Sequence, residues 1–147
     1  MWTGSYSQRA TGVPAEKLWN VWTDVNRWTE WQDDIESAKL DGPFAQGAII
    51  QLRPKGGPNV KVELQSVDPG VHYTDITRFP LAEMVVDHDL LRYGDEVEIR
   101  TNIKVTGPLS FLWSRIVAKD IVAGLPEQIR RMIERARALD KAPAVAA

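Results

Sequence analysis

The 147-residue chain contains no cysteine, which excludes disulfide frameworks, thiolate nucleophiles, iron–sulfur clusters and cysteine-ligated zinc. Histidine is scarce as well, because His72 and His88 are the only two in the sequence. A histidine-rich metal site therefore cannot be built, and we expect no metal. The sequence also lacks the phosphate-loop and dinucleotide-binding fingerprints, so we expect no cofactor.

Neither sign of charge is in large excess. The 18 basic and 20 acidic residues give a formal net charge of -2, which provides no field to attract phosphate backbones or anionic membranes. Nucleic acid is therefore not an expected partner. No run approaches the roughly 20 apolar residues needed to cross a bilayer, so membrane insertion is not expected either. The first residues lack the features of a signal peptide, and the expected location is the cytoplasm.

The composition is that of a folded globular chain, with 44% hydrophobic and 26% charged residues. A length of 147 residues is typical of one compact domain, which we place at 1–139. Residues 140–147 have no periodicity and predict a disordered tail.

Tryptophan is concentrated at the start of the chain, where five of the six lie within the first 31 residues. Pro14 suits the first helical position, and Leu18, Trp19 and Trp22 follow at helical spacing. These features predict a short helix that ends near Thr23. The broken polar segment 25–31 predicts a second helical turn.

Between residues 35 and 105 the apolar period changes to two, as in half-buried antiparallel strands. Val60, Val62 and Leu64 alternate with polar residues, and turn signals such as Asp68-Pro69-Gly70 separate the alternating segments. With the first strand of the chain, the predicted strands lie near 3–11, 33–40, 47–53, 59–67, 71–79, 82–92 and 95–106.

After Gly107-Pro108 the period becomes helical and remains so to Leu139. Leu125, Ile129 and Met132 recur on one side of this predicted helix over 109–139. Pro126 lies inside it and removes a backbone hydrogen bond, so we expect a bend there.

One strand, two short helices, six antiparallel strands and a long C-terminal helix is the order of the α+β helix-grip fold. Three segments of this chain carry a further resemblance. They are Pro14-Ala15-Glu16-Lys17-Leu18-Trp19-Asn20-Val21-Trp22-Thr23-Asp24-Val25 with Trp28 and Trp31, Leu40-Asp41-Gly42 with Gly47, and Gly107-Pro108-Leu109. The chain thereby resembles polyketide cyclase/dehydrase-like members of the START/SRPBCC superfamily. The resemblance implies a curved seven-stranded sheet around the C-terminal helix. It also implies an internal cavity for a lipid, sterol, polyketide or other apolar molecule, and a minority of members are enzymes.

The alternation predicts which side chains face that cavity. The predicted ligand-binding residues are Met84, Val86, His88, Leu90, Ile99, Thr101, Ile103, Leu125, Ile129, Tyr73 and Trp28. The strand 71–79 is ambiguous, since Tyr73, Asp75 and Thr77 share one face and His72, Thr74 and Ile76 share the other. We favour Tyr73 and Thr77 inward.

His88 is the candidate catalytic residue, because an imidazole among apolar neighbours can act as acid, base or hydrogen-bond partner of a ligand. Thr101 is a candidate partner for it. A metal at Asp87-His88-Asp89 is disfavoured, since adjacent strand side chains point to opposite faces.

Three functions are compatible with the sequence. The first is binding of a small apolar or aromatic ligand between sheet and helix, by a monomer or homodimer. The second is a cofactor-independent cyclase or dehydratase in the same cavity, for which a second inward ionisable group beside His88 would be the discriminating feature. The third is a protein-interaction module that docks through exposed Trp28 and Trp31.

Overall fold

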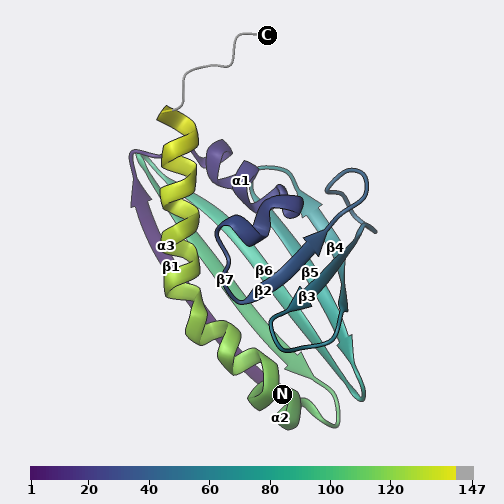
Figure 1. Cartoon of the computed structure of the whole chain (residues 1–147). Helices are drawn as coiled ribbons and strands as arrows, with labels where there is room; N and C mark the ends of the chain where they lie inside the picture. Colours follow the sequence, from purple (N-terminus) through teal and green to yellow (C-terminus); the bar gives the residue numbers. More distant parts are fainter. Residues whose placement is uncertain (142–147) are drawn as a thin grey trace.

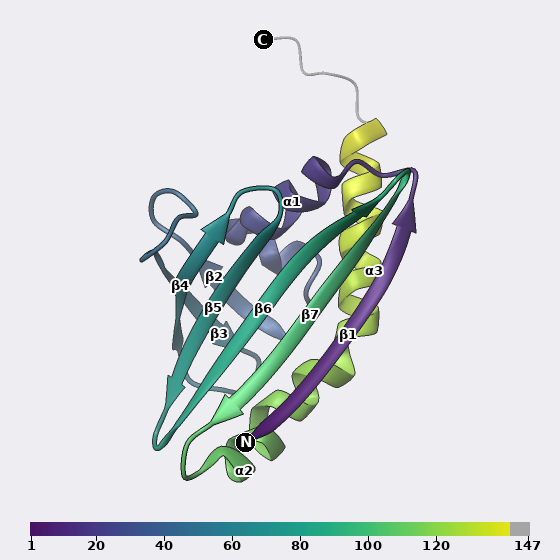
Figure 2. The ribbon, with the colours of Figure 1, turned by 180° about the vertical axis from the view of Figure 1, so that it is seen from behind.

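A computed structural model describes residues 1–141 and contains one seven-stranded antiparallel sheet in the order β1-β7-β6-β5-β4-β3-β2 (Figures 1 and 2). The strands are β1 (Trp2–Thr11), β2 (Ile35–Lys39), β3 (Ile49–Pro54), β4 (Val60–Asp68), β5 (His72–Phe79), β6 (Ala82–Tyr93) and β7 (Glu96–Thr106). All seven predicted strands are confirmed. Their alternating residues were sufficient because each strand buries one face against the helices.

Two short helices follow β1, as predicted. Helix α1 (Ala15–Thr23) begins directly after Pro14, which occupies the N-cap and not the first helical position. The 3-10 helix η1 (Val25–Glu30) continues the chain toward β2. Both cover one end of the sheet's concave face (Figure 1).

A continuous helical region runs from α2 (Ser110–Trp113) through the π-helical turn η2 (Ser114–Ala118) into α3 (Lys119–Lys141). The π-helical turn was not predicted. The helix continues two residues past the predicted end at Leu139, and the remainder of the predicted tail, 142–147, lies outside the described residues. Figures 1 and 2 show that the axis of this region changes direction along the sheet. Pro126 lies within α3, and its assignment as the origin of the bend stays a prediction.

The antiparallel register arranges the concave side chains in rows across the sheet. Tyr73 lies opposite His88, and His88 lies opposite Thr101. The buried apolar residues form two clusters, one on each side of this row along the strands. The cluster beneath α1 includes Trp22, Leu90, Ile99, Ile129 and Met132. The cluster beneath α2 and η2 includes Met84, Val86, Ile103, Val105 and Ala118.

Candidate functional site

A histidine–aspartate pair lies on the concave face between strands β5 and β6. The Nε2 atom of His88 is 2.8 Å from Oδ2 of Asp75, and the two side chains are 15% and 11% exposed. Asp75 shares the inward face with Tyr73 and Thr77, which resolves the ambiguity of β5 in favour of the predicted orientation. The structure thus places a second inward ionisable group beside His88, which is the feature that the cyclase or dehydratase hypothesis required.

The pair lies within a cluster of aromatic rings. Tyr73 stacks on His88 with 4.1 Å between ring centroids, and the Trp22 ring packs roughly perpendicular to both rings. Trp19 and Phe44 complete the cluster through edge contacts with Tyr73. Helix α1 supplies the two tryptophans, at the helical spacing visible in the sequence. The result is an apolar environment that favours flat ring systems.

The hydrogen bond to Asp75 determines where the imidazole carries its hydrogen. An ionised carboxylate only accepts hydrogen bonds, so Nε2 of His88 must donate. In the neutral ring Nδ1 is then an unprotonated acceptor. This atom is buried and has no hydrogen-bond partner within residues 1–141. A buried acceptor without a donor is unfavourable in an isolated fold, and it is the kind of atom that a ligand hydroxyl would satisfy.

Tyr73 is constrained to its neutral form by the same surroundings. Burial raises the pKa of its phenol well above the ordinary value, and the nearby negative charge of Asp75 raises it further. At neutral pH the ring therefore serves as a wall of the site and as a hydroxyl, not as a phenolate.

Apart from His88, the predicted ligand-binding residues are buried, but they divide between several parts of the core. Tyr73, Trp28, Leu90, Ile99 and Ile129 belong to the cluster beneath α1. Met84, Val86 and Ile103 belong to the cluster beneath α2 and η2, and Thr101 and Leu125 are also buried. Their role as ligand contacts stays a prediction.

Trp28 and Trp31 are buried, and the Trp28 indole donates to the carbonyl of Trp22 at 3.0 Å. This burial contradicts the hypothesis that they form an exposed docking surface.

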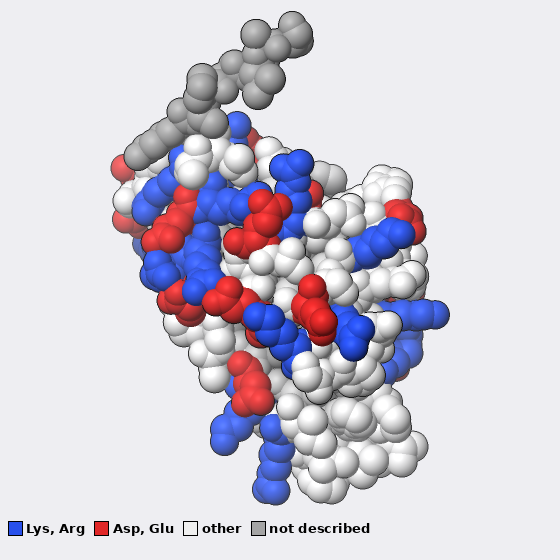
Figure 3. Space-filling model, viewed as in Figure 1, with Lys and Arg blue, Asp and Glu red and all other residues white. Residues whose placement is uncertain are grey.

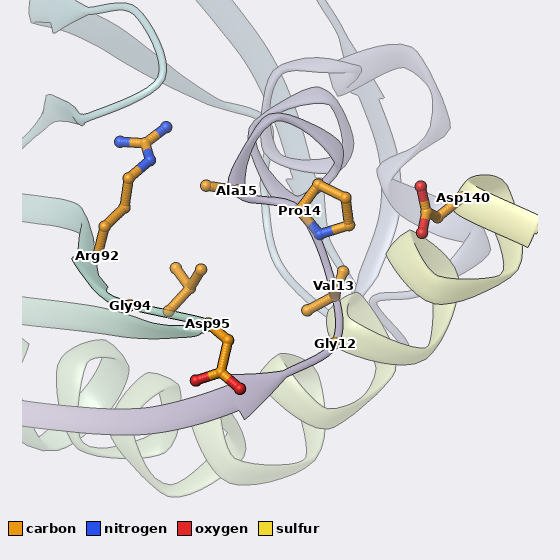
Figure 4. Close-up of a pocket in the computed structure, with 9 residues that line it drawn as sticks. Gly12, Val13, Pro14, Ala15, Arg92, Gly94, Asp95 and Asp140 are labelled. Atoms are coloured by element: carbon orange, nitrogen blue, oxygen red, sulfur yellow. The ribbon is translucent and has the colours of Figure 1, made fainter.

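Two hollows lie at the surface of the described chain. One, of about 350 Å³, lies between the β1–α1 link, the β6–β7 turn and the end of α3 (Figure 4). Arg92 and Asp140 lie on opposite sides of it, and Val97 contributes to its lining. Another, of about 540 Å³, lies between Trp31 and the outer side of α3.

The hollow beside Val97 borders the ends of β6 and β7, and β6 also carries His88. Val97 and Thr101 both lie on β7, and Thr101 is the residue opposite His88. At about 3.4 Å per residue, the row that contains Val97 is roughly 14 Å from the row that contains Thr101 and His88. One row separates them, formed by Leu90 opposite Ile99, and both side chains are fully buried. On the sheet, the Leu90–Ile99 row therefore lies between the surface hollow and His88.

The other histidine lies on the convex face. His72 Nδ1 is 2.6 Å from Asp89 Oδ1, and His72 Nε2 is 2.7 Å from the Thr74 hydroxyl, which donates to Asp87. Asp87 and Asp89 thus point away from His88, as strand alternation predicted. No group of three or more histidines, aspartates or glutamates within residues 1–141 is placed to hold a metal ion.

Asp75 is the member of this pair whose orientation the sequence left undecided. Thr101 was the predicted partner of His88, and it lies opposite His88 in the register, but the hydrogen bond goes to Asp75. A signal was present, because Asp75 lies between Tyr73 and Thr77 on the face expected to point inward. The aromatic contacts of Phe44 had no sequence signal, since they depend on how the β2–β3 loop folds back.

Comparison with known proteins gives the fold. No protein-family model matches the chain, and no curated protein matches it by sequence. Solved structures do match. Ara h 8.0201 is 14% identical with a TM-score of 0.70, over 93% of this chain and 99% of that one. Norcoclaurine synthase from Thalictrum flavum, in complex with dopamine and hydroxybenzaldehyde, is 13% identical with a TM-score of 0.68, over 97% and 90%. DynU16, from the dynemicin biosynthetic locus, is 19% identical with a TM-score of 0.67, over 95% and 47%.

A curved antiparallel sheet closed by a C-terminal helix, with two short helices after the first strand, defines a helix-grip protein. This chain has the helix-grip fold of these solved structures, and the fold implied by the resemblance of its turns and tryptophans is confirmed. No helix within residues 1–141 combines the length and apolar character needed to cross a membrane.

Proposed function

We propose that the chain binds a small apolar or aromatic molecule between the sheet and α3, with His88 and Thr101 orienting the polar end of the ligand. The observation that carries the proposal is the buried, unpartnered Nδ1 of His88 beside Asp75. An acceptor in an aromatic environment selects a ring that carries a hydroxyl or an N–H donor. The Leu90–Ile99 row would have to move for such a ligand to enter from the hollow beside Val97.

The direct test is a native mass spectrum of the freshly purified protein, followed by extraction and identification of any bound molecule. A stoichiometric apolar adduct would name the chemical class of the ligand. Independently, 2-naphthol and naphthalene can be compared as probes, because they differ by one hydroxyl. A hydrogen bond to Nδ1 predicts about tenfold tighter binding of 2-naphthol.

Matched variants locate the site. His88→Leu removes the acceptor and should abolish the preference for 2-naphthol while naphthalene still binds. Leu125→Trp fills the space between α3 and the sheet and should weaken both probes. Equal binding of the two probes by the unmodified protein, or a preference that survives His88→Leu, would contradict the assignment of His88.

A second function is favoured by the same pair. A carboxylate that orients a histidine through one ring nitrogen leaves the other nitrogen able to take a proton, so acid–base catalysis of a cyclisation or dehydration is chemically available. In such a reaction Nδ1 would remove a proton from the substrate, and Asp75 would stabilise the imidazolium that forms. In a dehydration the imidazolium would return this proton to the leaving hydroxyl, which departs as water. With the ligand class identified, turnover lost in His88→Gln and reduced in Asp75→Asn would support catalysis. Unchanged turnover in His88→Gln would exclude it.

A further inference from the structure

The end of the molecule opposite α1 exposes apolar side chains that belong to three separate segments. Leu81 in the β5–β6 turn is 64% exposed, and Phe111 and Ile116 at the start of the helical region are 60% and 54% exposed. Leu112 and Met1 are exposed beside them. We call these five residues the apolar tip; Figures 1 and 2 show the N-terminus and α2 together at this end.

Hydrogen bonds hold the segments of the apolar tip together. The backbone N–H of Leu109 donates to the carbonyl of Leu81 at 3.0 Å, and the Trp113 indole donates to the carbonyl of Pro80 at 2.9 Å. Trp113 also stacks on Phe79, with 4.5 Å between ring centroids. The segments that carry the exposed side chains are therefore held together at this end of the molecule.

Leu81 combines exposure with an unfavourable backbone conformation. Its φ angle is 58°, and it is the one non-glycine residue with positive φ within residues 1–141. The two-residue turn between β6 and β7 also has a residue at positive φ, at its first position, and that residue is a glycine, Gly94. Glycine or asparagine at position 81 would relieve the strain and expose less apolar surface. A strained and exposed leucine does not favour the isolated fold, which points to a contact outside it.

Charged residues at the border of the apolar tip favour one kind of partner. Arg115 and Lys119 are exposed on the turns that carry Phe111 and Ile116, against the single exposed acid Asp120. Glu83, close to the β5–β6 turn, lies 3.8 Å from Arg78, which also pairs with Glu63 at 2.7 Å. Figure 3 shows this end as mostly uncharged surface with basic side chains at its edge. Apolar residues bordered by cations match the interface of an anionic bilayer.

The size of the surface argues against a second copy of the chain. A stable dimer interface uses roughly 20–30 residues on each side, whereas the apolar tip has five at one narrow end of the molecule. A protruding group of this size can enter a bilayer interface without a matching surface.

We propose that the apolar tip docks peripherally on anionic membranes. Leu81, Phe111 and Ile116 enter the boundary between head groups and acyl chains, and Arg115 and Lys119 contact lipid phosphates. The net charge of -2 excludes strong long-range attraction, so the apolar contacts carry most of the binding. This proposal does not depend on ligand binding at His88, and each can fail without the other.

The test is co-sedimentation of the protein with vesicles of phosphatidylcholine containing 30 mol% phosphatidylglycerol, with pure phosphatidylcholine vesicles as reference. The unmodified protein should bind both, and the anionic vesicles more tightly. Leu81→Asn and Phe111→Ser should each weaken binding by about tenfold. Arg115→Gln should reduce the difference between the two vesicle types. Ile49→Ser and Val71→Ser are matched controls, because they remove exposed apolar side chains elsewhere.

Leu81→Asn separates docking from folding. It relieves backbone strain, so its melting temperature should be equal to or above that of the unmodified protein while its vesicle binding falls. The proposal is overturned if the unmodified protein does not sediment with either vesicle, or if the control variants weaken binding as much as Leu81→Asn. Light scattering that shows a dimer, dissociated by Leu81→Asn, would overturn it in favour of self-association.

Discussion

The two ends of the concave face depart from ordinary packing in opposite ways. Beneath α1 the core encloses a polar pair, His88 and Asp75, and leaves one of its nitrogens without a partner. At the apolar tip, Leu81 and Phe111 are exposed to solvent. Burying an unsatisfied acceptor and exposing apolar side chains are both unfavourable for an isolated protein. Both departures lie on one sheet, and they indicate two separate binding surfaces, one internal and one external.

The largest expected effect concerns the glycines that shape the two ends. Gly107 has a φ angle of 109°, and a Cβ there would lie 2.6 Å from the carbonyl oxygen of Leu81 and 2.9 Å from the Cα of Ala82. Gly94 has a φ angle of 64°, and a Cβ there would meet no atom within 4 Å. Gly107→Ala should therefore destabilise the fold by about 4 kcal/mol, since backbone strain adds to a clash with backbone atoms. Gly94→Ala should cost about 1 kcal/mol.

Urea unfolding of the two variants measures this difference directly. Similar losses of unfolding free energy would mean that the apolar tip is not braced by the close approach of the β7–α2 link to the β5–β6 turn. Gly107→Ala should also disturb the position of Leu81, and so weaken vesicle binding beyond its effect on stability.

The next largest effect is expected from two substitutions that each create a cavity of similar size, one at each end of the sheet. Leu90→Ala removes a buried side chain from the row that separates the surface hollow from His88, and Ile103→Ala removes one from the cluster beneath α2 and η2. Each should cost about 3 kcal/mol, because both residues are fully buried. Only Leu90→Ala should speed the association of 2-naphthol, by about tenfold, since it opens the route to the imidazole.

Stopped-flow fluorescence with 2-naphthol, beside thermal unfolding of both variants, measures the pair. An equal change in the 2-naphthol association rate for Leu90→Ala and Ile103→Ala would mean that the ligand does not enter past the Leu90–Ile99 row.

The sequence predicted which side chains face the inside of the sheet, but it did not predict the roles that we propose for the two ends of the sheet. Strand alternation placed Tyr73, His88 and Thr101 inward, because a period of two has only one solution once one face is buried. It left Asp75 undecided, since a carboxylate in a strand is ordinarily solvated. The hydrogen bond that orients His88 depends on the register between β5 and β6, which no local pattern encodes.

The exposure of the apolar tip could not be predicted from the sequence for a related reason. Phe111, Leu112 and Ile116 are typical of a buried helical face, and Leu81 is typical of a strand end. Their exposure follows from where the helical region begins relative to the sheet, and from a π-helical turn without a sequence signal. The low net charge excluded membranes as partners only at the level of the whole chain, because an average over 147 residues does not describe one end.

The smallest effect at neutral pH concerns Tyr73, beside the histidine–aspartate pair. Its pKa is raised by burial and by Asp75, so the folded state holds the phenol protonated where the unfolded state would release its proton. The stabilisation is fully present below the unfolded pKa of about 10 and is lost as the pH rises through the higher folded value. Tyr73→Phe should change stability by less than about 1.5 kcal/mol at pH 7, and it should unfold at higher pH than the unmodified protein in an alkaline titration.

Tyr93→Phe is the matched control, because Tyr93 is exposed at the end of β6 and contacts Arg9 across its ring. Absorbance of phenolate at 295 nm, followed with circular dichroism, separates ionisation from unfolding. In the unmodified protein one tyrosine should ionise together with unfolding, and this step should be missing in Tyr73→Phe but present in Tyr93→Phe. Ionisation of all three tyrosines while the fold is intact would show that water reaches Tyr73. The aromatic environment of His88 would then be open to solvent, and its unpartnered nitrogen would need no ligand to satisfy it.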